Sequence, residues 1–147
     1  MADSFVIQTV YTKAKEVLWR LDNFLVGTLG YERRGSNPGS WPTSYSDGGI
    51  PATGYTVLRN PSTSPTRFEV KITLDETPVG DDHLTFVMSP WINTGSGWTD
   101  GAGNFGSNPS CATVTLLLPE SNPRNTFIGS DRRFMVWVEK EGFAYDK

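Results

Sequence analysis

Residues 67–74 have the sequence Arg-Phe-Glu-Val-Lys-Ile-Thr-Leu. Apolar and polar side chains alternate along this segment without a break. Successive side chains of a β-strand point to opposite faces, so the alternation predicts a strand with one face on a core and the other in water. Residues 84–88 repeat the alternation after a connection that contains Pro78 and Gly80. We therefore predict two neighbouring antiparallel strands joined by a long hairpin loop.

Three further strands are predicted, at residues 112–118, at residues 133–139 and, as a short edge strand, at residues 55–58. In the segment 133–139, Met135 and Trp137 fall on the face opposite to the other apolar residues. A strand that is apolar on both faces is expected to be covered on both. The cover over Met135 and Trp137 is either the helix of the same chain or a partner.

One amphipathic helix is predicted near the start of the chain, at about residues 4–28. Apolar residues recur there at helical spacing, and charged residues fall between them. Asp3 or Ser4 is expected to cap the start, and Gly27 or Gly30 to end the helix through a left-handed turn. The apolar stripe packs either on the sheet or, in part, on a neighbouring subunit. Its members are Val10, Ala14, Val17, Leu18, Leu21, Phe24 and Leu25.

Two long irregular segments are expected, at about residues 31–54 and 89–110, where Gly, Ser, Asn and Pro are frequent and no periodicity is present. Loops longer than about 12–15 residues in a compact domain are usually functional or disordered. These two loops carry too many aromatic side chains to be plain linkers. The aromatic residues are Trp41, Tyr45, Trp91, Trp98 and Phe105.

These elements predict a single domain over residues 1–147, of the α+β class and mainly β. The N-terminal helix is expected to pack on an antiparallel sheet or small β-sandwich of about four to six strands. The β body spans about residues 55–147, and the two long loops are at 31–54 and 89–110. A chain of 147 residues is long enough for one core but short for two domains.

Composition narrows the class of function. Lys and Arg total 13 and Asp and Glu total 16, which gives a net charge of -3. Nucleic-acid binding relies on neutralising phosphates with cations, so we expect no nucleic-acid partner. Cys111 is the only cysteine, and the sequence lacks the features of a signal peptide or a membrane-spanning run. We expect synthesis in a cytoplasm and no membrane partner.

No catalytic, cofactor or metal-binding residues are predicted. His83 is the only histidine and has no accompanying nucleophile motif, so a small hydrolase would have to work with carboxylates. One His and one Cys are too few for a zinc site. The segment 100–104 offers two oxygen ligands in a glycine loop but lacks the spacing of a calcium loop. We expect a protein that is not an enzyme.

Aromatic rings in the loops are typical anchors of protein interfaces, and arginines are typical charge and hydrogen-bonding anchors. The same rings are also suited to stacking on sugars, so a carbohydrate-binding module stays open as an alternative. A loop ring can instead fold back on its own sheet, and a surface arginine can simply be solvated. The candidate interface residues are Trp41, Tyr45, Trp91, Trp98, Phe105, Arg33, Arg34, Arg132 and Arg133.

The final part of the chain carries a resemblance. Ser130-Asp131-Arg132-Arg133-Phe134-Met135-Val136-Trp137-Val138, followed by Gly142-Phe143-Ala144-Tyr145, resembles small virion structural proteins of tailed bacteriophages. The N-terminal helix and the long loops are also of the general kind found in those virion proteins. The resemblance implies an Asp-Arg-Arg turn that leads into a sheet strand, and copies that assemble around a tail, neck or baseplate. In that family the chain usually runs on beyond the aromatic segment, whereas this one stops at Lys147.

We therefore expect a non-enzymatic structural subunit of a tailed-phage virion, made in the host cytoplasm and placed in the tail or the head-to-tail connecting region. Its partners would be other copies of itself and other virion proteins. Symmetric assemblies bury loop aromatics and helix faces between copies, which fits this sequence. The alternatives are a carbohydrate-binding module that uses the loop aromatics to bind glycan, and a capsid decoration protein.

Overall fold

The computed structural model describes residues 4–8, 14–62, 67–76, 82–90, 92–93, 98–99, 112–118 and 123–140. These residues form an α+β fold that is mainly β, as predicted. Its helical elements are α1 (Ala14–Asn23), a π-helical turn η1 (Phe24–Thr28) and a 3-10 turn η2 (Asp47–Gly49). Its strands are β1 (Ser4–Gln8), β2 (Glu32–Asn37), β3 (Tyr55–Arg59), β4 (Phe68–Asp75), β5 (Asp82–Pro90), β6 (Ile92–Asn93), β7 (Trp98–Thr99), β8 (Ala112–Leu118), β9 (Pro123–Gly129) and β10 (Phe134–Lys140).

The strands form three antiparallel sheets. The largest has the order β2-β3-β4-β5-β8, the second has the order β1-β9-β10, and β6 pairs with β7. Ten strands are more than the four to six expected, because several short strands have little periodicity of their own. In the two larger sheets β2, β8, β1 and β10 are the edge strands.

The alternating segment at 67–74 forms β4, the middle strand of the five-stranded sheet. The side chains of Val70, Ile72 and Leu74 are fully buried. β5 is its antiparallel neighbour, with Ile72 opposite Phe86 and Leu74 opposite Leu84. Both strands and their pairing are thus confirmed.

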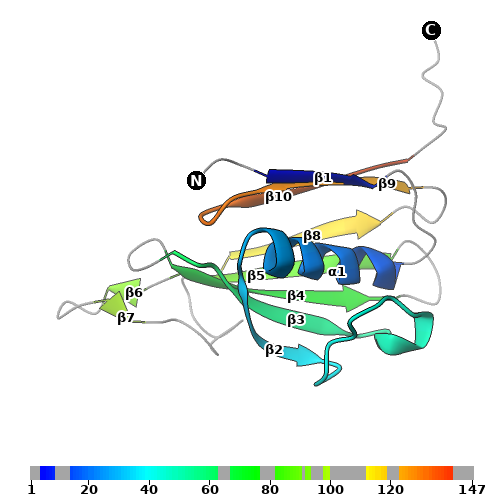
Figure 1. Ribbon diagram of the computed structural model, residues 1–147, viewed down its shortest axis with the longest axis horizontal. Coiled ribbons are helices and arrows are strands. Elements are labelled where there is room, and N and C mark those ends of the chain that lie inside the picture. Colours follow the sequence, from blue (N-terminus) through cyan, green and yellow to red (C-terminus); the bar gives the residue numbers. More distant parts are fainter. Residues whose placement is uncertain are drawn as a thin grey trace, which may run out of the picture.

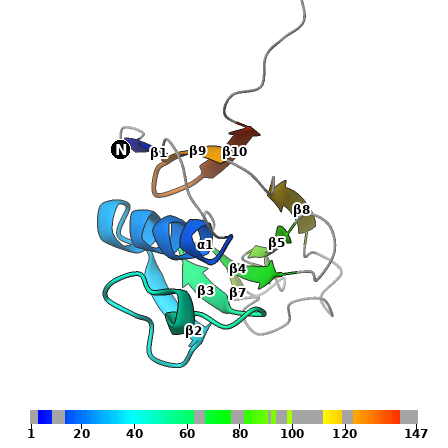
Figure 2. The ribbon, with the colours of Figure 1, turned by 90° about the vertical axis from the view of Figure 1, so that its right-hand side faces the viewer.

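Helix α1 lies between the two larger sheets (Figures 1 and 2). It packs on β4 and β5, and its continuation η1 brings Phe24 against Phe127 of β9, with ring centroids 5.9 Å apart. Every described member of the predicted apolar stripe is buried. The core therefore forms between both sheets and the helix, and the helix is an interior layer.

The predicted start of the helix is wrong. Residues 4–8 form β1, which pairs with β9 from Ser4 opposite Gly129 to Gln8 opposite Asn125. Ser4 is therefore no helix cap. This segment contains the β-branched residues Val6 and Ile7, which favour strands when a partner strand is available. The end of the helical run agrees with the prediction, because Gly30 follows it with a φ of 77°.

The predicted loop at 31–54 also contains regular structure. β2 is a polar edge strand with an irregular register between Arg33 and Gly35, so it shows no alternation in the sequence. It pairs with β3, which is therefore an inner strand and not the predicted edge strand. Within 89–110, β5 extends to Pro90 and β6 pairs with β7; the other residues of that segment lie outside the described ranges. β9 was not predicted.

Candidate protein–protein interface

Among the described side chains of the second sheet, the most exposed large apolar ones lie on the hairpin of β9 and β10. Phe134, Val136 and Val138 of β10 pack against the core. Met135 and Trp137 alternate with them, and 51% and 59% of their surfaces are exposed. α1 lies on the opposite side of this sheet, so the helix does not cover Met135 and Trp137 (Figure 1). We name these two side chains, with Ile128 opposite Met135, the hairpin face.

The turn of this hairpin is fixed to the rest of the molecule. The Ser130 N–H donates to the Arg133 carbonyl over 2.7 Å and closes the turn. The Tyr31 hydroxyl donates to the Ser130 carbonyl over 3.1 Å, and the Asn60 amide donates to the Asp131 carbonyl over 2.7 Å. Burial raises the pKa of Tyr31, and the charge of Asp131 raises it further. The hairpin is thus held in one position relative to the five-stranded sheet.

Gly129 allows this close packing at the end of β9. A Cβ atom on Gly129 would lie 2.8 Å from Leu29 Cδ1, 2.9 Å from the Arg133 carbonyl oxygen and 2.9 Å from Phe134 Cβ. Real Cβ atoms essentially never approach other atoms so closely. Any larger residue would therefore push the hairpin away from the loop after α1.

Edge strand β8 also exposes apolar side chains, one on each of its faces, because Val114 pairs with Phe86 and Leu117 pairs with His83. Val114 and Leu117 are 63% and 62% exposed, and the strand contains no charged residue, proline or glycine along its seven residues. Natural proteins usually protect edge strands with charges, prolines or bulges. β8 has none of these devices.

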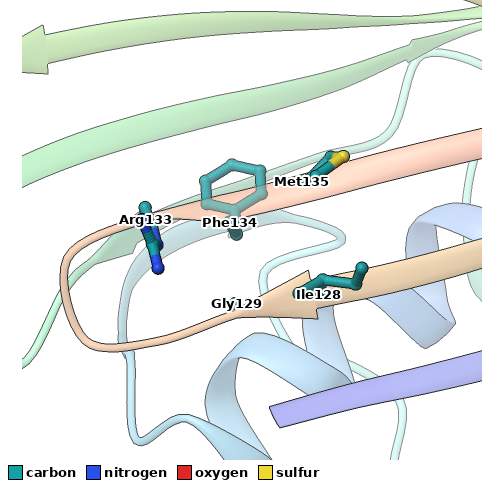
Figure 3. A pocket seen from close by; sticks show the side chains of 5 residues that line it. All are labelled: Ile128, Gly129, Arg133, Phe134 and Met135. Atoms are coloured by element: carbon teal, nitrogen blue, oxygen red, sulfur yellow. The ribbon is translucent and has the colours of Figure 1, made fainter. Parts of the chain in front are cut away.

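Two cavities border the hairpin. One, of about 240 Å³, is a groove between β10 and the β5–β8 pair, and its lining includes Phe86, Met88, Val114, Leu116 and Val136. The other, which we name the hairpin pocket, has a volume of about 380 Å³ and is shown in Figure 3. Its lining consists of Ile128, Gly129, Arg133, Phe134 and Met135.

Two of the predicted loop aromatics fold back onto the body of the protein. Trp41 is half-buried and packs against the core, with the Arg33 guanidinium 5.4 Å from its ring centroid. The Tyr45 ring lies 6.1 Å from that of Trp19, and the Trp19 indole donates to the Pro42 carbonyl over 3.0 Å. Both rings therefore stabilise the loop that carries them.

The predicted arginines divide into two groups. Arg33 binds Asp22, which is fully buried on α1, through two hydrogen bonds. Arg34 lies 2.9 Å from Glu32 and 3.6 Å from Glu69. Both arginines are thus engaged in ion pairs within the chain.

Arg132 and Arg133 are exposed at the tip of the β9–β10 hairpin. The side chain of Arg132 is 69% exposed and lies 3.8 Å from the carboxylate of Asp131. Arg133 lines the hairpin pocket. The structure brings these two arginines next to the hairpin face.

Trp91 and Phe105 lie outside the described residues, and for Trp98 only the backbone in β7 is described. The predicted site missed Met135, Trp137, Val114 and Leu117, although the sequence contains a signal for each pair. Met135 and Trp137 are apolar on the face away from the core, and Leu117 belongs to three consecutive leucines. A strand apolar on both faces indicates a second cover.

Other chemistries have little support in the part of the chain that the structure describes. His83 lies 3.3 Å from the carboxylate of Asp75. No three His, Cys, Asp or Glu side chains lie close enough together, among the described residues, to hold a metal ion. The described ranges also include no helix with the length and apolarity needed to cross a membrane.

Comparisons with protein-family models, with curated proteins and with solved structures found no match for this chain.

Proposed function

We propose that this protein is a non-enzymatic structural subunit of a tailed-phage virion, assembling with copies of itself and other virion proteins in the tail or head-to-tail connecting region. The observation that carries the proposal is the exposure of Met135 and Trp137 on a hairpin that is otherwise rigidly held. Tryptophan is strongly enriched among the residues that dominate binding energy at protein interfaces. A rigid surface also loses little conformational entropy when it binds.

Burial of the hairpin face and of the exposed β8 side chains against another protein is energetically favourable. Burial of one large apolar side chain contributes about 1.5–3 kcal/mol. Scattered exposed apolar residues are normal, but Met135 and Trp137 are neighbours on one face, and β8 offers an unprotected strand edge. Coverage by another protein removes the Met135 and Trp137 side chains and the edge of β8 from water.

The resemblance to phage virion proteins supplies the biological setting. It implies an Asp-Arg-Arg turn followed by a sheet strand, and the chain turns at residues 131–132 and enters β10 at Phe134. This agreement supports the virion assignment.

Immunogold labelling of purified particles of the phage that encodes this chain tests the assignment. Label at the tail or neck is expected. Label spread over the capsid would favour a decoration protein, and particles free of the chain would overturn the virion role.

A carbohydrate-binding module is the second candidate, because the Trp137 ring is 59% exposed on a sheet face, where a sugar can stack on it. Binding of the protein to a glycan array measures this directly. The structural-subunit proposal predicts no glycan binding above background. Binding that is lost in Trp137→Ala and retained in the loop variant Thr43→Ala would favour the sugar-binding function.

A further inference from the structure

Among the described side chains, basic and acidic groups gather in two different parts of the molecule. The tip of the β9–β10 hairpin lies in the same half of the molecule as β6 and β7, and the end of β4 and the start of β5 lie in the other half along the long axis (Figure 1). Around the tip are Arg67, Arg132 and Arg133, with Asp131 as the nearby carboxylate. We name this region, together with the hairpin pocket, the basic end.

The opposite end is acidic. Asp75 ends β4 and Asp82 begins β5. The Lys15 ammonium connects this region to η2, because it donates to the Asp47 carbonyl over 3.2 Å and lies 3.9 Å from the Glu76 carboxylate. We name Asp47, Asp75, Glu76 and Asp82 the acidic end; two basic residues lie among them, Lys15 and His83, and His83 is 3.3 Å from the Asp75 carboxylate.

The protonation of Tyr45 reflects the negative field at this end. Burial raises the pKa of Tyr45, and its hydrogen bond to Asp47 raises it further. The charges of Asp47, Glu16 and Glu76 act in the same direction. A positively charged surface docked here would relieve this concentration of negative charge.

We infer that copies of this chain associate head to tail, with the basic end of one copy against the acidic end of the next. The inference rests on the proposed function and specifies its contact. Two basic ends would repel one another, so a symmetric contact between hairpin tips is disfavoured. The hairpin pocket adds an apolar surface beside Arg133, where the contact can exclude water.

A head-to-tail contact uses two different surfaces of the same chain. Such heterologous contacts generate closed rings when the rotation between copies closes and open filaments when it does not. Because the two surfaces lie in different halves of the molecule, every copy in the interior of such an assembly can use both (Figure 1).

Charge exchange provides the test. Two double variants, Arg132→Glu with Arg133→Glu and Asp75→Lys with Glu76→Lys, are compared with wild type by sedimentation velocity over a concentration series. Each is expected to weaken self-association roughly tenfold or more, because like charges then face each other. A variant with all four changes has the charges exchanged between the ends and is expected to regain association. Arg132→Lys with Arg133→Lys retains the charge and serves as the matched control.

A mixture of the two double variants is expected to regain association, because both contacts between unlike variants pair opposite charges, whereas contacts between copies of the same variant pair like charges. Wild-type association is also expected to weaken with salt, since the Debye length falls from about 30 Å at 0.01 M to about 3 Å at 1 M. Thermal unfolding of each variant establishes that it folds.

The opposing results are distinguishable from failure of the proposed function. If both double variants fold and self-associate as strongly as wild type, the head-to-tail contact is overturned. The proposal of a self-assembling subunit would still hold in that case. The contact would also be overturned if both double variants lost association and the folded variant with all four changes did not regain it. Wild type that stays monomeric at every concentration would overturn the contact and also count against self-assembly. Binding of DNA by the basic end in place of a second copy would assign that surface to nucleic acid.

Discussion

Arg33 of edge strand β2 binds the carboxylate of Asp22, which is fully buried on helix α1. Thr56 of β3 donates a third hydrogen bond to the same carboxylate over 2.7 Å. The guanidinium group of Arg33 also lies over the Trp41 ring. One buried charge thus joins the helix, the edge of the five-stranded sheet and the loop after β2.

Replacement of Arg33 by alanine is expected to lower the free energy of unfolding by about 3–5 kcal/mol, because it leaves the Asp22 carboxylate buried without its cation. Urea denaturation measures the loss. The control is Arg20→Ala, which removes an ordinary helix-surface pair with Glu16 and should cost about 0.3–0.5 kcal/mol. Equal losses in both variants would show that the Asp22–Arg33 pair has no special role.

Tyr31 makes the stability sensitive to alkaline pH. Its pKa is raised above the ordinary value of 10.0, so above about pH 10 the unfolded chain loses the hydroxyl proton while the folded chain keeps it. Folding stability is therefore present in full below pH 10 and declines as the pH rises further. Tyr45 contributes in the same direction.

The Tyr31→Phe variant is expected to show a shallower decline in stability above pH 10. At pH 7 it should lose about 1 kcal/mol, because the hydrogen bond to the Ser130 carbonyl is removed. Denaturant unfolding at several pH values gives both quantities. A decline as steep as that of wild type would mean that Tyr31 is not the responsible group.

Gly129→Ala is expected to destabilise the protein by roughly 1–3 kcal/mol, because the added methyl group overlaps Leu29, Arg133 and Phe134. Thermal unfolding measures the effect. Gly39→Ala is the matched control, since a Cβ atom there meets nothing within 4 Å. If both variants unfolded at the wild-type temperature, the hairpin would be less tightly held than its contacts indicate.

The central strands and the helix were predictable because their buried residues recur in the sequence with the period of the element they form. β4 alternates without interruption, and the stripe of α1 repeats at helical spacing, so both could be assigned from local pattern alone. β1 and β2 could not, since their structure depends on distant partners. β1 pairs with β9 more than a hundred residues away, and β2 is a polar edge strand with a bulged register.

The candidate interface was predictable only in part. Trp41 and Tyr45 looked like interface anchors because they lie in a Gly- and Pro-rich segment, but that loop folds onto α1 through Trp19, a contact between residues distant in sequence. The resemblance implied that Arg132 and Arg133 lie in a turn, and the structure adds the hairpin pocket beside them. The exposure of Met135 and Trp137 on β10 becomes evident only when the sheet shows which face the helix covers.

Light scattering of the purified chain over a concentration series, with Met135→Ser/Trp137→Ser as the comparison, tests self-assembly through the hairpin face most directly. We predict that the wild-type mass rises above the 16.2 kDa of a single chain as the concentration increases. The mass of the folded double variant is expected to stay closer to that of a single chain. A wild-type protein that remains at 16.2 kDa at every concentration, or a folded variant that assembles as well as wild type, would contradict it.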